Sequence, residues 1–129
     1  MRTIEEKIIA ALRSGNRFKK LSCRDSVKVE ENKIEYYLWD NLLFWSNSDN
    51  IYFFSGRGWN TLTTKNRLNA ILYNFLHAYI LQKNYKWFLN WNNKEYPIDA
   101  TNIFYFKGDK LYKKASHDVE VLPREIVKG

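Results

Sequence analysis

Three basic residues at the entrance of an expected helix are the side chains that most directly suggest chemistry. Arg57 lies between Gly56 and Gly58, and Lys65 and Arg67 fall in the first turns of the helix that follows. The N-terminus of a helix carries unpaired N–H groups and a partial positive charge, so acidic residues are its usual neighbours. Cations at this place predict a site for an anion such as a phosphate; the alternative is three solvated side chains.

The uneven distribution of charge favours a polyanion as the ligand. The chain of 129 residues has a formal net charge of +7. Residues 50–94 contain no Asp or Glu and hold half of the aromatic residues. The cations of this stretch are Arg57, Lys65, Arg67, Lys83, Lys86 and Lys94. Nucleic acids fit such a surface, because their phosphates meet the cations and their unpaired bases stack on Trp59, Tyr85 or Trp91. Core packing of these rings is the alternative.

The residues that enzymes use are scattered, which favours a binding protein over an enzyme. His77 and His117 are the only histidines, and no nucleophile or carboxylate lies near His77 in the sequence. No Cys/His spacing fits zinc, and no phosphate-binding loop or nucleophile elbow is present. The single cysteine, Cys23, is expected to be an unreactive thiol in a reducing compartment. We therefore predict no catalytic residue, no metal site and no cofactor.

One long amphipathic helix is predicted to position the candidate site. Its apolar residues recur at helical spacing, at Leu68, Ile71, Leu72, Phe75, Leu76, Tyr79 and Ile80. We expect the helix to run from Thr64 to Gln82, with Thr63 or Thr64 as its N-cap. Such a stripe needs a wide apolar partner, most simply a sheet. Trp59 is expected to close the end of that sheet, and architecture explains Arg67 and Asn69 least.

The other elements predict an α+β fold. Turn residues and apolar alternation between 26 and 58 predict an antiparallel meander of about four strands, on which the long helix packs. A short helix from Arg2 to Leu12 is expected before it, with Thr3 and Glu6 as a capping box. After the long helix, residues 84–91 predict a strand and residues 103–112 a hairpin. The basic run at 13–20 is read as a solvated connector.

Length predicts a single domain over residues 1–129, with the helix at 1–14, the core at 24–98, and a C-terminal hairpin and tail at 99–129. Val119, Val121, Ile126 and Val127 of the tail are expected to pack as a strand or an extension. No apolar run is long enough to cross a membrane, and residues 1–12 lack the apolar core of a signal peptide. We therefore expect a cytoplasmic protein without a membrane partner.

The segment Gly58–Asn69 (GWNTLTTKNRLN) resembles the helix entrance of a family of small uncharacterised phage and prophage proteins. In that family a short β meander ends in the pattern G-W-x-T-x-T-T-x-x-R-L-N. Leu38–Leu43 and Phe88–Ile98 are similar to its strand–turn–strand and to its last hairpin, so the resemblance covers roughly residues 24–98. It implies a viral or prophage source in a host cytoplasm. No established activity comes with it, and DNA transactions and interference with host defence are both typical of such genes.

Two functions follow from these observations. The first is nucleic-acid binding through the basic, aromatic-rich surface of residues 50–94. The alternative is a protein-interaction module: an inhibitor of a host protein, or a homodimer formed through the open face of the sheet. Its apolar patch would include Tyr37, Trp39, Phe44 and Trp45. The charge distribution favours the first.

Overall fold

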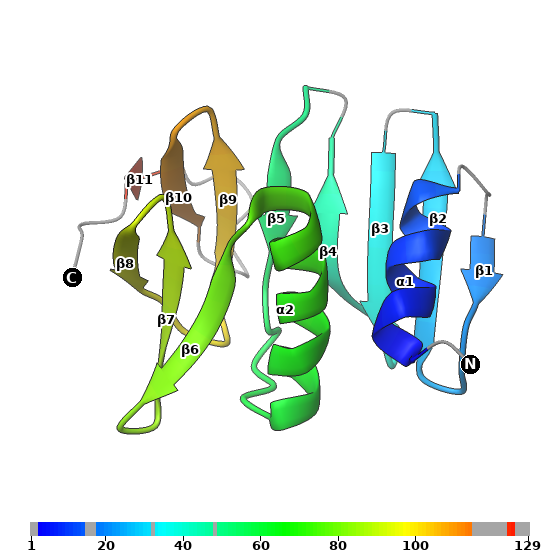
Figure 1. Cartoon of the computed structure of the whole chain (residues 1–129), viewed down its shortest axis with the longest axis horizontal. Coiled ribbons are helices and arrows are strands. Elements are labelled where there is room, and N and C mark those ends of the chain that lie inside the picture. Colours follow the sequence, from blue (N-terminus) through cyan, green and yellow to red (C-terminus); the bar gives the residue numbers. More distant parts are fainter. Residues whose placement is uncertain (1–2, 15–17, 32, 48, 115–123, 126–129) are drawn as a thin grey trace.

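The computed structural model describes residues 3–14, 18–31, 33–47, 49–114 and 124–125 (Figure 1). Its helices are α1 (Ile4–Arg13) and α2 (Leu62–Leu76). The larger sheet has the strand order β1-β2-β3-β4-β5-β9-β10-β11. These strands are β1 (Phe18–Lys20), β2 (Asp25–Glu30), β3 (Lys33–Leu38), β4 (Asn41–Ser46), β5 (Tyr52–Phe54), β9 (Ile103–Lys107), β10 (Lys110–Lys114) and β11 (Arg124–Glu125). The smaller sheet consists of β6 (Tyr79–Lys83), β7 (Lys86–Trp91) and β8 (Lys94–Pro97), in that order.

Both helices and the smaller sheet cover one face of the larger sheet. Figure 1 shows α1 in front of β2 and β3, α2 in front of β4 and β5, and the smaller sheet in front of β9 and β10. Trp91 of β7 meets Phe106 of β9 edge to face, with ring centroids 4.8 Å apart. The apolar core therefore lies between one large sheet and a layer built from two helices and three strands.

Strand register brings the largest core residues onto one line across five strands. Val27, Tyr36, Phe44, Phe54 and Phe104 are successive partners in β2, β3, β4, β5 and β9, and none of them is more than 1% exposed. Successive residues of a strand point to opposite faces, so this line fixes which face each strand buries. The α2 residues Leu68, Ile71 and Leu72 pack into the same core.

The predicted α+β architecture is confirmed in most of its parts. The meander appears as β2 to β5, the strand at 84–91 as β7, and the late hairpin as β9 and β10. Helix α1 has the predicted capping box: the Thr3 hydroxyl accepts from the Glu6 N–H, and the Glu6 carboxylate accepts from the Thr3 N–H. Both interactions satisfy N–H groups that the first turn would otherwise leave unpaired.

The predicted length of the central helix is wrong at both ends. The N-cap is Thr61, and the helix stops at Leu76 because His77 has a left-handed backbone with φ of 53°. The next residues form β6, where Ile80 is buried opposite Leu89 of β7. A spacing of three and four residues suits a helix face, but it could not distinguish Ile80 on a helix from Ile80 on a strand.

Other features of the sheets were not predicted. Part of the basic run forms the edge strand β1, and the late hairpin extends the meander through pairing of β9 with β5. Strands β6 to β8 form a separate sheet. These pairings join residues far apart in the sequence, which local patterns do not encode. The expected packing of Val119, Val121, Ile126 and Val127, and the position of His117, lie outside the described residues.

Candidate functional site

Arg67, a predicted ligand residue, is engaged inside the protein. Its side chain is 7% exposed, and it donates from Nε to Asp25 Oδ1 at 2.9 Å and from a terminal nitrogen to Glu5 Oε2 at 2.5 Å. A cation on a helix face is read from sequence as solvated or ligand-binding. Here its partners come from positions about 40 and 60 residues earlier. The structure thus corrects the expectation that Arg67 faces a ligand.

Asp25 is the centre of a set of buried and half-buried polar side chains that we call the Arg67 network: Arg67, Asp25, Glu5, Tyr36 and Ser22. Tyr36 and Ser22 both donate hydroxyl hydrogen bonds to the Asp25 carboxylate. Burial alone would raise the pKa of Asp25, but the bonds from Tyr36, Arg67 and Ser22 outweigh it and hold the pKa below its usual value. Burial and the same bond raise the pKa of Tyr36. The network joins both helices to β2 and β3.

Asn69 is also explained by architecture. Its side-chain amide donates to the Ile80 carbonyl at 3.0 Å and accepts from the Ile80 N–H at 2.5 Å. Strand β6 lies at the edge of the smaller sheet, with β7 as its neighbour there. Asn69 therefore pairs with β6 as a neighbouring strand would, at one residue.

Arg57 projects onto the sheet face that the helices do not cover. Its Nε donates to the Leu42 carbonyl at 2.8 Å, and its guanidinium carbon lies 5.1 Å from the centroid of the Trp45 ring. Burial lowers the pKa of Arg57. The preceding Gly56 is required, because a Cβ there would lie 2.7 Å from the Ala100 carbonyl oxygen. The anion site predicted from Arg57, Lys65 and Arg67 is therefore not assembled.

The remaining predicted cations differ in their burial and in whether they form an ion pair. Lys83 of β6 is paired with Glu95 of β8 at 2.8 Å. Lys86 and Lys94 are exposed at the two ends of the β7–β8 hairpin region, and Lys65 is half-buried on α2. Of this group, Lys86 lies beside an exposed aromatic ring and lines a hollow with it.

Three exposed aromatic residues, Trp39, Trp59 and Tyr85, border two hollows, and we call them the aromatic edge. They are 59%, 54% and 89% exposed. Trp39 and Trp59 flank a hollow of about 430 Å³, and Tyr85 borders another of about 210 Å³. Asn60 lines the second hollow and follows Trp59 directly. Figure 1 shows the β3–β4 turn, the start of α2 and the β6–β7 turn toward the same, lower end of the molecule.

The first hollow is lined by apolar residues and also by polar groups of the chain. Its lining includes Arg24, Asn41 and the threonines of the α2 entrance, Thr61, Thr63 and Thr64. The Arg24 side chain is 43% exposed, and the Trp39 N–H donates to the Arg24 carbonyl at 2.8 Å. Arg24 is therefore held next to Trp39. Lys86 has the corresponding place beside Tyr85 at the second hollow.

The backbone at two of these rings is unfavourable for large side chains. Trp39 and Asp40 have φ of 50° and 66°, and Asn84 and Tyr85 have φ of 50° and 65°. Each pair forms the two-residue turn of a hairpin, where left-handed φ is needed at both positions and Gly or Asn is preferred. Bulky residues with positive φ are uncommon and point to a role beyond folding.

A comparison with known protein families shows the family of this chain. Residues 1–112 match the Kyanoviridae Gp96 protein, a family of phage proteins. The chain belongs to this family. The match includes the N-terminal helix, which lay outside the resemblance drawn from the sequence. No curated protein and no solved structure matched the chain.

Sequence reasoning found Trp59 and Tyr85 but gave Arg24 no role and placed Trp39 in a different surface. Trp59 does not close the sheet end, since half of its side chain is exposed. For Trp91 the alternative of core packing holds, because it is 6% exposed. The turn signal at Asp40 marked a hairpin but could not show that Trp39 shares a hollow with Trp59, which is distant in sequence.

The apolar patch expected on the open sheet face is only partly present. Trp45 and Tyr37 are half-buried, whereas Phe44 faces the core with no exposure. The rings of Trp45 and Phe53 stack at 5.3 Å between centroids, and Phe53 meets Tyr105 at 5.1 Å. The faces of these rings are covered by contacts with one another, so only the ring edges are available to a ligand.

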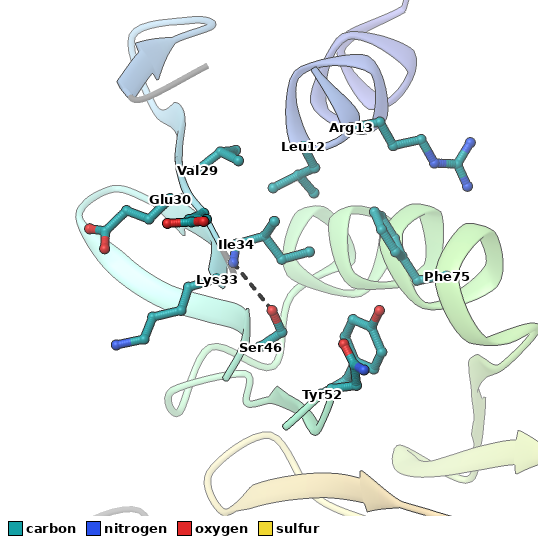
Figure 2. Close-up of a pocket in the computed structure, with 11 residues that line it drawn as sticks. Leu12, Arg13, Val29, Glu30, Lys33, Ile34, Ser46, Tyr52 and Phe75 are labelled. Carbon is teal, nitrogen blue, oxygen red and sulfur yellow. Dashed lines mark hydrogen bonds between the residues drawn. The ribbon is translucent and has the colours of Figure 1, made fainter. Parts of the chain in front are cut away.

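A larger hollow, of about 680 Å³, lies near the C-terminal ends of both helices. Leu12, Ile34 and Phe75 form apolar walls. The Arg13 guanidinium carbon lies 5.2 Å from the centroid of the Phe75 ring, and Figure 2 shows the charged end of Lys33 pointing away from the walls. None of the cations predicted for the site lines it, although Tyr52 and Phe75 of the stretch 50–94 do. Among the described residues no cluster could hold a metal, and neither helix is long and apolar enough to cross a membrane.

Proposed function

We propose that the protein binds single-stranded nucleic acid along the aromatic edge, and that it is a binding protein and not an enzyme. The observation that carries this proposal is the exposure of Trp39 and Tyr85 in turn positions that disfavour large residues. Stacking of unpaired bases contributes about 1–3 kcal/mol per base and tolerates any sequence. A largely exposed ring in a strained turn is suited to act as such a platform.

The hollows and cations beside the rings fit the same ligand. The hollow between Trp39 and Trp59 has room for a base, and Arg24 on its lining can meet a neighbouring phosphate. Asn60 connects this place to the hollow at Tyr85 and Lys86. A strand following this line would contact about three aromatic residues in succession, whereas paired bases could not reach the ring faces.

The test is fluorescence anisotropy of labelled oligothymidylate, with the matching duplex as competitor, at low and physiological salt. Trp39→Gly and Trp59→Ala should each weaken binding about tenfold, in line with the loss of one stacked base. The matched control is Tyr73→Ala, which removes a ring that is 57% exposed on α2 and outside both hollows. Arg24→Ala and Lys86→Ala should reduce the salt dependence, whereas Lys33→Ala should not.

Equal loss of affinity in the Tyr73 variant, or binding that does not change with salt, would contradict the proposal. If no oligonucleotide binds at low salt, the alternative of a protein-interaction module gains support. A homodimer through the open sheet face would then show as a concentration-dependent mass in sedimentation, reduced by Trp45→Ala.

A further inference from the structure

Among the described residues, strand β1 has no partner on its outer side, so it forms one edge of the larger sheet. Its neighbour in the sheet is β2, with Lys19 opposite Val27. The Leu21 N–H donates to the Asp25 carbonyl at 2.8 Å, two residues along from that pair. Hydrogen-bonded pairs alternate along an antiparallel ladder, so Lys19 also bonds toward β2. The N–H and C=O groups of Phe18 and Lys20 therefore point away from β2.

A groove lies beside this edge. It has a volume of about 530 Å³ and separates α1 from β1. Figure 1 shows why it exists: α1 lies in front of β2 and β3, and β1 extends past it at the end of the sheet. Its floor is formed by the small residues Ala10 and Ala11 of α1. An added strand would therefore find space for the side chains that point toward the helix layer.

The positive charge of the groove determines which kind of partner strand can bind there. The described residues that line it include Lys7, Lys19 and Lys20, and no carboxylate. All three lysines are exposed. Lysines on an edge strand also hinder unwanted sheet-to-sheet pairing, because a second basic edge is repelled. The same charge attracts an edge partner that is acidic, and Phe18, which is 64% exposed, offers it an apolar contact.

We propose that the β1 edge binds an extended acidic segment of a partner protein by strand addition. The backbone groups of Phe18 and Lys20 would pair with the segment, and its carboxylates would meet Lys7 of α1 and Lys19, which is the partner of the buried Val27 and so lies on the helix side of the sheet. This surface shares no residue with the aromatic edge, so it does not depend on the proposed nucleic-acid function.

The probe for this proposal is a labelled peptide of about ten residues in which Thr and Glu alternate. Nitrogen-15 NMR should show shifts at β1, and amide exchange should slow at Phe18 and Lys20 but not at Lys19. A peptide of the same sequence with every backbone nitrogen methylated has the same charge but no N–H group to donate, so it cannot pair as a strand. It should bind weakly or not at all, and a Thr-Lys peptide should not bind.

Two variants of Lys20 separate charge from backbone pairing. Lys20→Ala removes the charge alone, whereas Lys20→Pro also removes an N–H that points to the free edge. We expect the Pro variant to bind the Thr-Glu peptide about fivefold more weakly than the Ala variant, the effect of one hydrogen bond. Lys107→Glu, an exposed charge reversal on β9, is the control and should leave binding unchanged.

Three results would overturn the proposal. Equal binding of the N-methylated peptide would show that charge alone acts. Equal affinity of the Lys20→Ala and Lys20→Pro variants would exclude pairing at that N–H. Competition by oligothymidylate that depends on Lys19 and Lys20, and not on Trp39, would show that the groove binds nucleic acid.

Discussion

The Arg67 network and the aromatic edge are neighbours at the start of α2. The central side chains of the network are buried and hydrogen-bonded, whereas those of the aromatic edge are exposed. Arg67 and Asp25 are buried, and each has more than one partner. Trp39 and Tyr85 are large, exposed and held in backbone conformations that suit small residues. A buried polar group with all its partners is explained by folding, whereas an exposed ring in a strained turn is not. The comparison separates residues that build the fold from residues available to a ligand.

The largest effect is expected from breaking the network. Arg67→Ala would leave the buried Asp25 carboxylate with only the more distant Arg24, whose Nε lies 3.9 Å away, and loss of one partner of a buried pair costs about 3–5 kcal/mol. Urea unfolding followed by circular dichroism measures the free energy of unfolding. Lys65→Ala on the same helix, without an ion pair among the described residues, is the control and should change it little. A loss below about 1 kcal/mol for Arg67→Ala would mean that the network does not hold the helices to the sheet.

The network should also make stability depend on acid. The pKa of Asp25 is lower in the folded protein than in the unfolded chain, so the unfolded chain binds its proton more readily. The stabilisation is complete above the unfolded pKa, near 3.8, and is lost as the pH falls through the lower folded value. Unfolding free energies measured between pH 6 and pH 2 should fall in the acidic part of this range. In Asp25→Asn this component should be absent, and an unchanged acid profile would contradict the role of Asp25.

Asn69 should have an intermediate effect. Asn69→Ala would leave the Ile80 N–H and carbonyl without their side-chain partner, and an unsatisfied buried group costs about 1–3 kcal/mol. Asn69→Asp keeps the acceptor for the Ile80 N–H and loses the donor, so it should fall between the wild type and the Ala variant. Asn74→Ala, which removes an exposed hydrogen bond within α2, is the control. Equal unfolding free energies for all four proteins would assign Asn69 another role.

The same comparison shows what the sequence could and could not predict. Period and turn chemistry identified the meander, α1 with its cap, and the hairpin of β9 and β10, because these depend on neighbouring residues. The partners of Arg67 and Asn69 come from other elements, so a cation and an amide on a helix could not be told from ligand residues. The grouping of Trp39, Trp59 and Tyr85 depends on three separate elements, and the turn strain that singles out two of them is a property of the backbone.

The smallest and most specific effect is expected from single substitutions in the two turns of the smaller sheet. Asn84–Tyr85 joins β6 to β7 and Asn92–Asn93 joins β7 to β8, and all four residues have positive φ. Tyr85→Gly creates the favoured Asn-Gly pair and should raise the free energy of unfolding by about 1 kcal/mol, because it removes a large side chain from a left-handed position. Its oligothymidylate binding should nevertheless weaken. Asn93→Tyr is the mirror variant and should lower stability by a similar amount without improving binding. If Tyr85→Gly both destabilised the protein and left binding intact, Tyr85 would belong with the residues that build the fold, and the aromatic edge would lose its third ring.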